Sequence, residues 1–215
     1  MKQLVIFDLD GTLLNTIADL AEAVNRALVA CGFVEHPTDA YRFFVGDGVS
    51  KLFERALPPD ARTAENIARI RTHFMPYYEA HNADLSRPYE GILELLAELQ
   101  SRGVKMAVAS NKYQAATQKL VRHYFGDTEF VAVFGQREGV AIKPDPQIIF
   151  DVLEVAGVTP EDVIYVGDSN VDMQTGTRAG VDTVGVSWGF RPREELVAHN
   201  PLAIIDHPLQ LLDLL

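Results

Sequence analysis

The chain has little cysteine, no long apolar run and a deficit of positive charge. Cys31 is the single cysteine among 215 residues, which excludes an internal disulfide framework and favours a reducing compartment. The N-terminal segment MKQLVIFDLDG lacks the long apolar stretch of a signal peptide, and no run approaches the roughly 18 apolar residues of a membrane-spanning helix. We therefore expect a cytoplasmic protein without a membrane partner.

The charge balance restricts the class of partner. Lysine and arginine number 19 against 30 acidic residues, which gives a formal net charge of −11. This charge argues against nucleic acid as a partner, since nucleic-acid binding depends on basic surfaces. An anionic small molecule would need a locally positive site made by a metal ion or a few well-placed cations. We expect a small-molecule partner and a monomer or homodimer.

Short apolar runs predict strands at 4–7, 105–110, 130–135, 162–168 and 182–187. Segments of helix length separate most of these runs, and one such helix should end at Gly157. Strands that are apolar on both faces are typical of a parallel sheet covered by helices on both sides. The fold class is therefore predicted to be α/β with an open parallel sheet.

The segment between the first two strands is too long for one crossover helix. It shows no strand pattern, and its periodicity predicts helices over 16–32, 48–57 and 64–82. We expect an inserted all-helical subdomain of residues 16–86. The sheet core would then consist of residues 1–15 and 87–215.

Polar residues collect where the predicted strands end, at the edge of an open parallel sheet where ligands bind. They are Asp8 and Asp10 after the first strand, Ser110 and Asn111 at the second, Lys143 after the third, and Asp168 and Asp172 after the fourth. Clustered carboxylates repel each other unless a divalent cation neutralises them, and oxygen ligands favour Mg²⁺. Asp8, Asp168 and the backbone carbonyl of Asp10 are the predicted ligands.

The remaining groups at this edge favour phosphoryl transfer. Lys143 adds positive charge, Ser110 offers a hydroxyl, and a helix expected to begin near Asn111 would direct N–H groups at an anion. Asp8 is the predicted nucleophile, and Asp10 would protonate the leaving oxygen and later deprotonate water. Asp172 would either orient the metal site or cap a helix.

Four segments, DLDGT (8–12), ASN (109–111), KP (143–144) and GDSNVD (167–172), resemble the motifs of the haloacid dehalogenase superfamily. This resemblance implies a Rossmann-like core, a helical cap inserted after the first motif, Mg²⁺ dependence and a phosphoaspartyl intermediate. It also makes Thr12 a candidate for substrate binding, and Asp10 indicates a phosphotransferase branch. DLDGTLLNTIADL, VGDGVSKLFERAL and GVSWGF are most similar to the phosphoglycolate phosphatase group, which implies hydrolysis of 2-phosphoglycolate.

The expected cap contributes weaker candidates. Gly46, Asp47 and Gly48 form either a turn before a helix or, by the resemblance, a loop that faces the substrate. Trp188 either lines the rim of the crevice or packs beneath it. A sugar phosphomutase would share all four motifs. A phosphoaccepting signalling module is a further alternative, although it needs no helical insertion and takes its acidic pair and acceptor from different strands.

Overall fold

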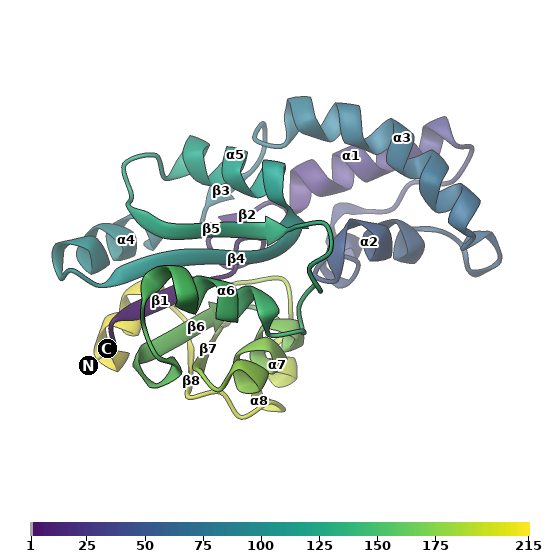
Figure 1. The fold of residues 1–215 in the computed structure, drawn as a ribbon. Helices are drawn as coiled ribbons and strands as arrows, with labels where there is room; N and C mark the ends of the chain where they lie inside the picture. The colour runs from purple at the N-terminus through teal and green to yellow at the C-terminus, as the bar shows by residue number, and fades with distance from the viewer. Residues whose placement is uncertain (1) are drawn as a thin grey trace. The chain divides into compact units, whose positions relative to one another are not determined.

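The computed structural model describes residues 2–215 and contains a six-stranded sheet in which neighbouring strands pair in parallel (Figure 1). The strand order is β5-β4-β1-β6-β7-β8. The strand bounds are β1 Leu4–Phe7, β4 Lys105–Tyr113, β5 Phe130–Gln136, β6 Val163–Gly167, β7 Asp182–Val186 and β8 Ala203–Ile205. The predicted α/β fold class is confirmed.

The strand β1 lies in the middle of the sheet because its side chains are apolar on both faces. All four of its residues are buried. It pairs with β4 on one side and β6 on the other, so that Phe7 aligns with both Val108 and Val166. Helix-covered parallel strands of this kind place their carboxyl ends at one edge. The residues that follow β1, β4 and β6 are therefore neighbours.

Helices cover both faces of this sheet (Figure 1). Right-handed crossovers place α4 and α5 on one face, whereas α6 and α7 pack against each other on the opposite face. The bounds are α4 Ile92–Ser101, α5 Gln114–Tyr124, α6 Gln147–Ala156, α7 Asn170–Ala179 and α8 Arg193–Val197, with short 3₁₀ helices η3 Pro160–Asp162 and η4 Pro208–Leu214. Gly157 ends α6 in the left-handed conformation, as predicted.

Two local features differ from the sequence prediction. The helix expected near Asn111 begins at Gln114, because β4 continues through Tyr113, which pairs with Gln136 after a register shift. The polar residues 110–112 thus belong to a strand although the apolar pattern ends at Ala109. The edge strand β8 was not predicted, since three residues are too few to show a period.

Contacts between Cα atoms divide the chain into two compact units, Met1–Asn15 with Pro88–Leu215 and Thr16–Arg87. The second unit holds three α-helices and two 3₁₀ helices, namely α1 Ile17–Ala30, η1 Thr38–Phe43, α2 Gly48–Ala56, η2 Pro59–Ala61 and α3 Ala64–His81. The two-residue strands β2 (Leu14–Asn15) and β3 (Arg87–Pro88) flank this unit in the sequence.

A buried carboxylate fixes the end of the second unit to its beginning. Asp19 is 3% exposed in the first turn of α1. Its Oδ1 accepts a hydrogen bond from the N–H of Leu85 at 2.9 Å, and its Oδ2 accepts from the N–H and Oγ of Ser86 at 2.8 and 2.6 Å. These charge-assisted bonds join residues near both ends of the inserted segment.

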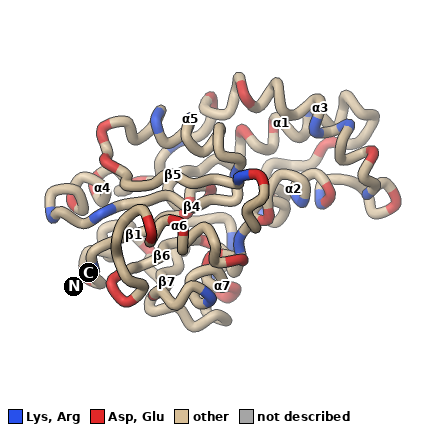
Figure 2. The backbone as a smooth tube through the Cα atoms, viewed as in Figure 1, with Lys and Arg blue, Asp and Glu red and all other residues tan. Residues whose placement is uncertain are grey.

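Acidic and basic residues are interspersed along the helices and loops of each unit (Figure 2). Within residues 2–215, no helix has both the length and the apolar character needed to cross a bilayer.

Candidate functional site

The site lies where the strand connections reverse direction. The chain leaves β1 toward β4 and β5, returns to β6, and then continues toward β7 and β8. The carboxyl ends of β1 and β6 therefore border the topological switch point, the common place for a ligand in an open α/β sheet. Asp8 follows β1 directly and its N–H donates to the carbonyl of Val166 at 2.9 Å, whereas Asp168 follows β6 directly.

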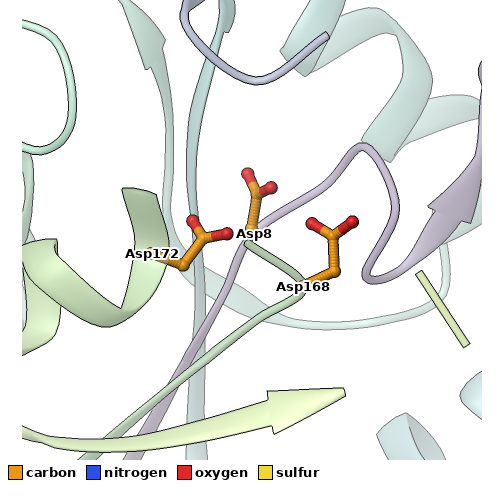
Figure 3. Close-up of side chains that lie close together, drawn as sticks. All are labelled: Asp8, Asp168 and Asp172. Carbon is orange, nitrogen blue, oxygen red and sulfur yellow. The ribbon is translucent and has the colours of Figure 1, made fainter. Parts of the chain in front are cut away.

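Three buried carboxylates meet at this edge. Oxygen atoms of Asp8, Asp168 and Asp172 lie within 4.8 Å of one another. The side chains of Asp8 and Asp168 come from the ends of two adjacent strands, and Asp172 comes from the first turn of α7 (Figure 3). Carboxylates buried this close together repel each other strongly. The arrangement therefore requires positive charge nearby.

Lys143 supplies one positive charge at the centre of the cluster. Its side chain is 2% exposed. Its Nζ donates to Asp8 Oδ1 at 2.9 Å, Asp172 Oδ1 at 2.8 Å, the hydroxyl of Tyr165 at 2.7 Å and the carbonyl of Ala109 at 3.0 Å. Lys143 thus lies beside Asp8, at the sheet edge where it was predicted to lie, whereas Tyr165 was not among the predicted site residues.

The side chain of Asn111 fixes the backbone of this lysine. Its Nδ2 donates to the carbonyl of Lys143 at 3.0 Å, and its Oδ1 accepts from the N–H of Lys143 at 2.8 Å. Both polar atoms of the amide therefore engage the Lys143 backbone. Asn111 was predicted to bind substrate, and in the structure its contacts suit the positioning of Lys143.

Asp172 uses both of its oxygens within the protein. Its Oδ1 accepts from Lys143 and, at 2.8 Å, from the hydroxyl of Tyr165. Its Oδ2 accepts from the N–H and Oγ of Ser169 at 3.1 and 2.6 Å, at the start of α7. One oxygen of Asp172 thus caps the start of α7, which was one of its two sequence interpretations, and the other oxygen accepts from Lys143. A role of Asp172 in orienting a metal site remains a prediction.

Burial and mutual repulsion change the acidity of the cluster. Burial, together with the charges of Asp172 and Asp10, raises the pKa of Asp8 from 3.8 to about 7 against the opposing effect of Lys143. Burial and the charges of Asp172 and Asp8 also raise the pKa of Asp168 well above its usual value. Burial favours the neutral form of Asp172, but its bonds to Lys143, Ser169 and Tyr165 prevail and lower its pKa.

The donor set fits a divalent cation. Three carboxylates around one ammonium leave two uncompensated negative charges when all are ionised, which is the charge that such a cation would neutralise. Oxygen atoms of Asp8 and Asp168 are the suitable ligands, because both oxygens of Asp172 accept protein hydrogen bonds. The cluster of Asp8, Asp168 and Asp172 is therefore able to hold a divalent metal ion.

Asp10 forms an ion pair that the sequence did not predict. The Nζ of Lys112 lies 3.0 Å from Oδ1 and 2.9 Å from Oδ2 of Asp10. Ser110 is 2% exposed, and its Oγ accepts a 3.3 Å bond from the N–H of Lys112. Lys112 directly follows the ASN segment in the sequence. Its position next to a predicted motif was the one sequence feature that could have identified it as a site residue.

The segment 188–190 holds both Asp168 and the first motif. The indole N–H of Trp188 donates to the carbonyl of Thr12 at 3.0 Å, and the N–H of Phe190 donates to Asp168 Oδ2 at 2.7 Å. A Cβ on Gly189 would overlap the side chain of Asp168. Trp188 is half-buried and anchors this segment, and sequence reasoning identified neither Gly189 nor Phe190.

Thr12 lies inside the first compact unit, which contains the six-stranded sheet and is called the core unit below. It is fully buried, and its Oγ1 has no hydrogen-bond partner among residues 2–215. Its carbonyl is the acceptor for Trp188. Thr12 therefore helps to hold the turn after β1, and its predicted contact with substrate remains a prediction.

The three cap candidates belong to the second unit. Gly46 and Gly48 have positive φ angles of 125° and 80°, and Asp47 precedes α2. The guanidinium of Arg55 pairs with the Asp47 carboxylate and also donates to the carbonyl of Phe44 at 3.0 Å. Glycine adopts these positive φ angles without steric strain, which explains its presence at both positions of the loop. The contact of this loop with a substrate remains a prediction.

Comparisons with known proteins agree with this geometry. The haloacid dehalogenase-like hydrolase family profile matches residues 5–186. A phosphoglycolate phosphatase from Mesorhizobium japonicum is 31% identical over 96% of this chain and 91% of its own length, and one from Pseudomonas putida is 34% identical over 96% of this chain and 77% of its own.

A solved structure extends the likeness to three dimensions. A protein from Lactobacillus delbrueckii subsp. bulgaricus, provisionally assigned as a phosphoglycolate phosphatase, superposes with a TM-score of 0.90 at 33% identity. The match covers 98% of this chain and 97% of that one. The chain described here belongs to the haloacid dehalogenase-like hydrolase family.

Proposed function

We propose that this chain is a Mg²⁺-dependent phosphatase that hydrolyses a small phosphate monoester, 2-phosphoglycolate being the preferred substrate. The observation that supports this most is the buried cluster of Asp8, Asp168 and Asp172 around Lys143 at the switch point. The names of the relatives add the substrate class. The net charge of −11 favours a small anion over nucleic acid, and the single cysteine favours a cytoplasmic setting.

Asp8 is the proposed nucleophile. A carboxylate oxygen of Asp8 forms a bond to phosphorus, the bond from phosphorus to the ester oxygen breaks, and an aspartyl phosphate results. Lys143 lies 2.9 Å from Asp8 and offers positive charge to the transferred group. When bound by Asp8, Asp168 and the carbonyl of Asp10, Mg²⁺ would neutralise charge on the phosphoryl oxygens.

Asp10 is the proposed acid and base. It gives its proton to the departing ester oxygen in the first step. In the second step it takes a proton from the water that attacks the aspartyl phosphate, which releases inorganic phosphate and regenerates Asp8. Its place two residues after Asp8 puts both groups in the turn that follows β1.

Selection among phosphate esters is assigned to the second unit, because core groups that recognise the phosphoryl group are common to all such esters. The loop formed by Gly46, Asp47 and Gly48 is the proposed contact for the organic part of the substrate. Its positive-φ glycines allow a close approach of backbone N–H groups to a carboxylate.

A turnover screen tests the proposal. The purified chain is assayed for phosphate release from a set of small phosphate esters, with Mg²⁺, with EDTA and with Ca²⁺, and Asp8→Asn is the control variant. We expect turnover with Mg²⁺ alone, highest with 2-phosphoglycolate, and inhibition by Ca²⁺, whose looser coordination misplaces the reacting groups. Full activity in EDTA or in Asp8→Asn would refute the mechanism.

A further inference from the structure

The core unit contains a second buried lysine that the mechanism above does not use. Lys112 and Asp10 are 4% and 12% exposed in their side chains, and one ammonium contacts both carboxylate oxygens at 2.9 to 3.0 Å. The pair lies at the carboxyl end of β4 and in the turn after β1. It is a separate ion pair from the one between Lys143 and Asp8.

The backbone of Lys112 is fixed on both sides. Its N–H donates to Ser110 Oγ at 3.3 Å, and its carbonyl accepts from Oγ1 of the fully buried Thr117 at 3.1 Å. A Cβ on Gly135 of the neighbouring strand would overlap this carbonyl, so glycine provides the space that the strand end needs. The side chain of Lys112 therefore extends from a fixed backbone. Its ammonium in turn fixes the position of the Asp10 carboxylate.

Stability alone is a weak reason for this pair. Removing an ammonium and a carboxylate from water costs several kcal/mol per ion, and apolar side chains of similar size often stabilise a fold as well or better. Asp10 is also the group whose proton must reach the ester oxygen, and a displacement of about 1 Å can slow such a step by about 10²-fold. A partner that fixes both carboxylate oxygens has a clear use there.

We infer that Lys112 is a positioning residue that holds the carboxylate of Asp10 in place for proton transfer, an inference that rests on the proposed phosphatase function. Lys112 acts through Asp10 and is not assigned a contact with substrate. Removal of Lys112 should therefore lower the rate of the step in which Asp10 transfers a proton and change the other steps little. Once Asp10 is removed, Lys112 should have no further effect on rate.

A double-mutant cycle measures this dependence. Lys112→Met, Asp10→Asn and the double variant are compared by kcat/KM with 2-phosphoglycolate and with 4-nitrophenyl phosphate, because kcat/KM reports the transfer to Asp8. Lys112→Met should lower kcat/KM for 2-phosphoglycolate by about 10- to 100-fold. The loss should be smaller for 4-nitrophenyl phosphate, whose leaving group needs little protonation. The double variant should match Asp10→Asn within about 2-fold.

Lys105→Met is the matched control. Lys105 begins the same strand, and its Nζ donates to the carbonyl of Ala156 at 2.7 Å, at the opposite end of β4 from Asp10. This variant should keep the kinetics of the parent with both esters. Thermal unfolding is measured for every variant. If Lys112→Met does not fold, Lys112→Gln, which keeps a hydrogen-bond donor without the charge, replaces it in the cycle.

Each outcome decides the inference. Losses that add in the double variant, a Lys112 variant that changes only KM, or equal losses with both esters would overturn it. The first two results would indicate a direct contact of Lys112 with substrate, and the third a general disturbance of the fold. A parent protein that turns over neither ester refutes the proposed function and this inference together, whereas additive losses in an active parent refute the inference alone.

Discussion

Replacing Asp8 with asparagine should abolish turnover and, without metal, make the protein more stable above pH 7. Asp8 is 8% exposed and shares a buried site with Asp168 and Asp172. Burial and the neighbouring carboxylates raise the pKa of Asp8 from 3.8 to about 7. Asparagine has nearly the same shape and carries no charge. Its amide oxygen can still accept the hydrogen bond from Lys143.

The size of the effect follows from the pKa of Asp8. The unfolded chain loses this proton near pH 3.8 and the folded chain near pH 7, so folding stability falls as pH rises between these values. The rise in pKa corresponds to about 4 kcal/mol of lost stability once the folded carboxyl is ionised, and to about 1 to 2 kcal/mol at pH 5. The Asp8→Asn variant avoids this loss, so its advantage should grow with pH up to about 7 and then level off.

Chemical denaturation in EDTA from pH 5 to pH 8 measures the difference in unfolding free energy between parent and variant. Mg²⁺ should reverse the order by stabilising the parent more than the variant, since a ligand that binds the native state raises its stability. Lys105→Met serves as a control whose stability difference from the parent should not follow this pH dependence. An Asp8→Asn variant that is no more stable than the parent at pH 8 would refute the electrostatic reasoning, whatever its activity.

Three other substitutions test separate parts of the structure. Gly189→Ala places a methyl group against Asp168 and should raise the Mg²⁺ concentration for half-maximal activity by about 10- to 100-fold; an unchanged metal titration would contradict this. Asp19→Ala removes three hydrogen bonds to residues 85–86 and should lower the free energy of unfolding by roughly 2 to 4 kcal/mol, measured with urea; a loss under about 0.5 kcal/mol would show that the bonds matter little. Gly48→Val strains a φ of 80° and should raise KM for 2-phosphoglycolate several-fold while the hydrolysis of 4-nitrophenyl phosphate changes little; equal kinetics with the parent would remove the loop from the substrate site.

The convergence of the core motifs was predictable because parallel strands share one carboxyl edge. The apolar run at 4–7 and the run at 162–168 were enough to place Asp8 and Asp168 at one edge of the sheet once the sheet was taken to be parallel, and the structure shows that the two strands are neighbours. The same rule brought Lys143 to this edge. The prediction depended on the apolar strand runs and on their alternation with segments of helix length, which indicates a parallel topology. Both features are visible in the sequence.

The end of β4 could not be predicted in this way. Apolar character stops at Ala109, yet the strand continues to Tyr113 because a neighbouring strand pairs with Tyr113 after a register shift. Strand pairing is a non-local property, and the polar residues in this stretch carry no period that would show it. Because of this error, the helix was expected to begin near Asn111, whereas it begins at Gln114, and the ion pair that Lys112 makes was not foreseen.

The charges at the site show that the net charge of the chain does not describe the local charge of the candidate active site. A net charge of −11 indicates an acidic protein, yet the structure buries Lys112 and Lys143 among the acidic residues of one sheet edge. Asp10 is matched by Lys112, and Lys143 is shared between Asp8 and Asp172. Asp168 is held by a backbone N–H and by the space that Gly189 leaves for it. Four carboxylates against two lysines leave a deficit of two positive charges, and that deficit gives a divalent cation its place beside the proposed nucleophile.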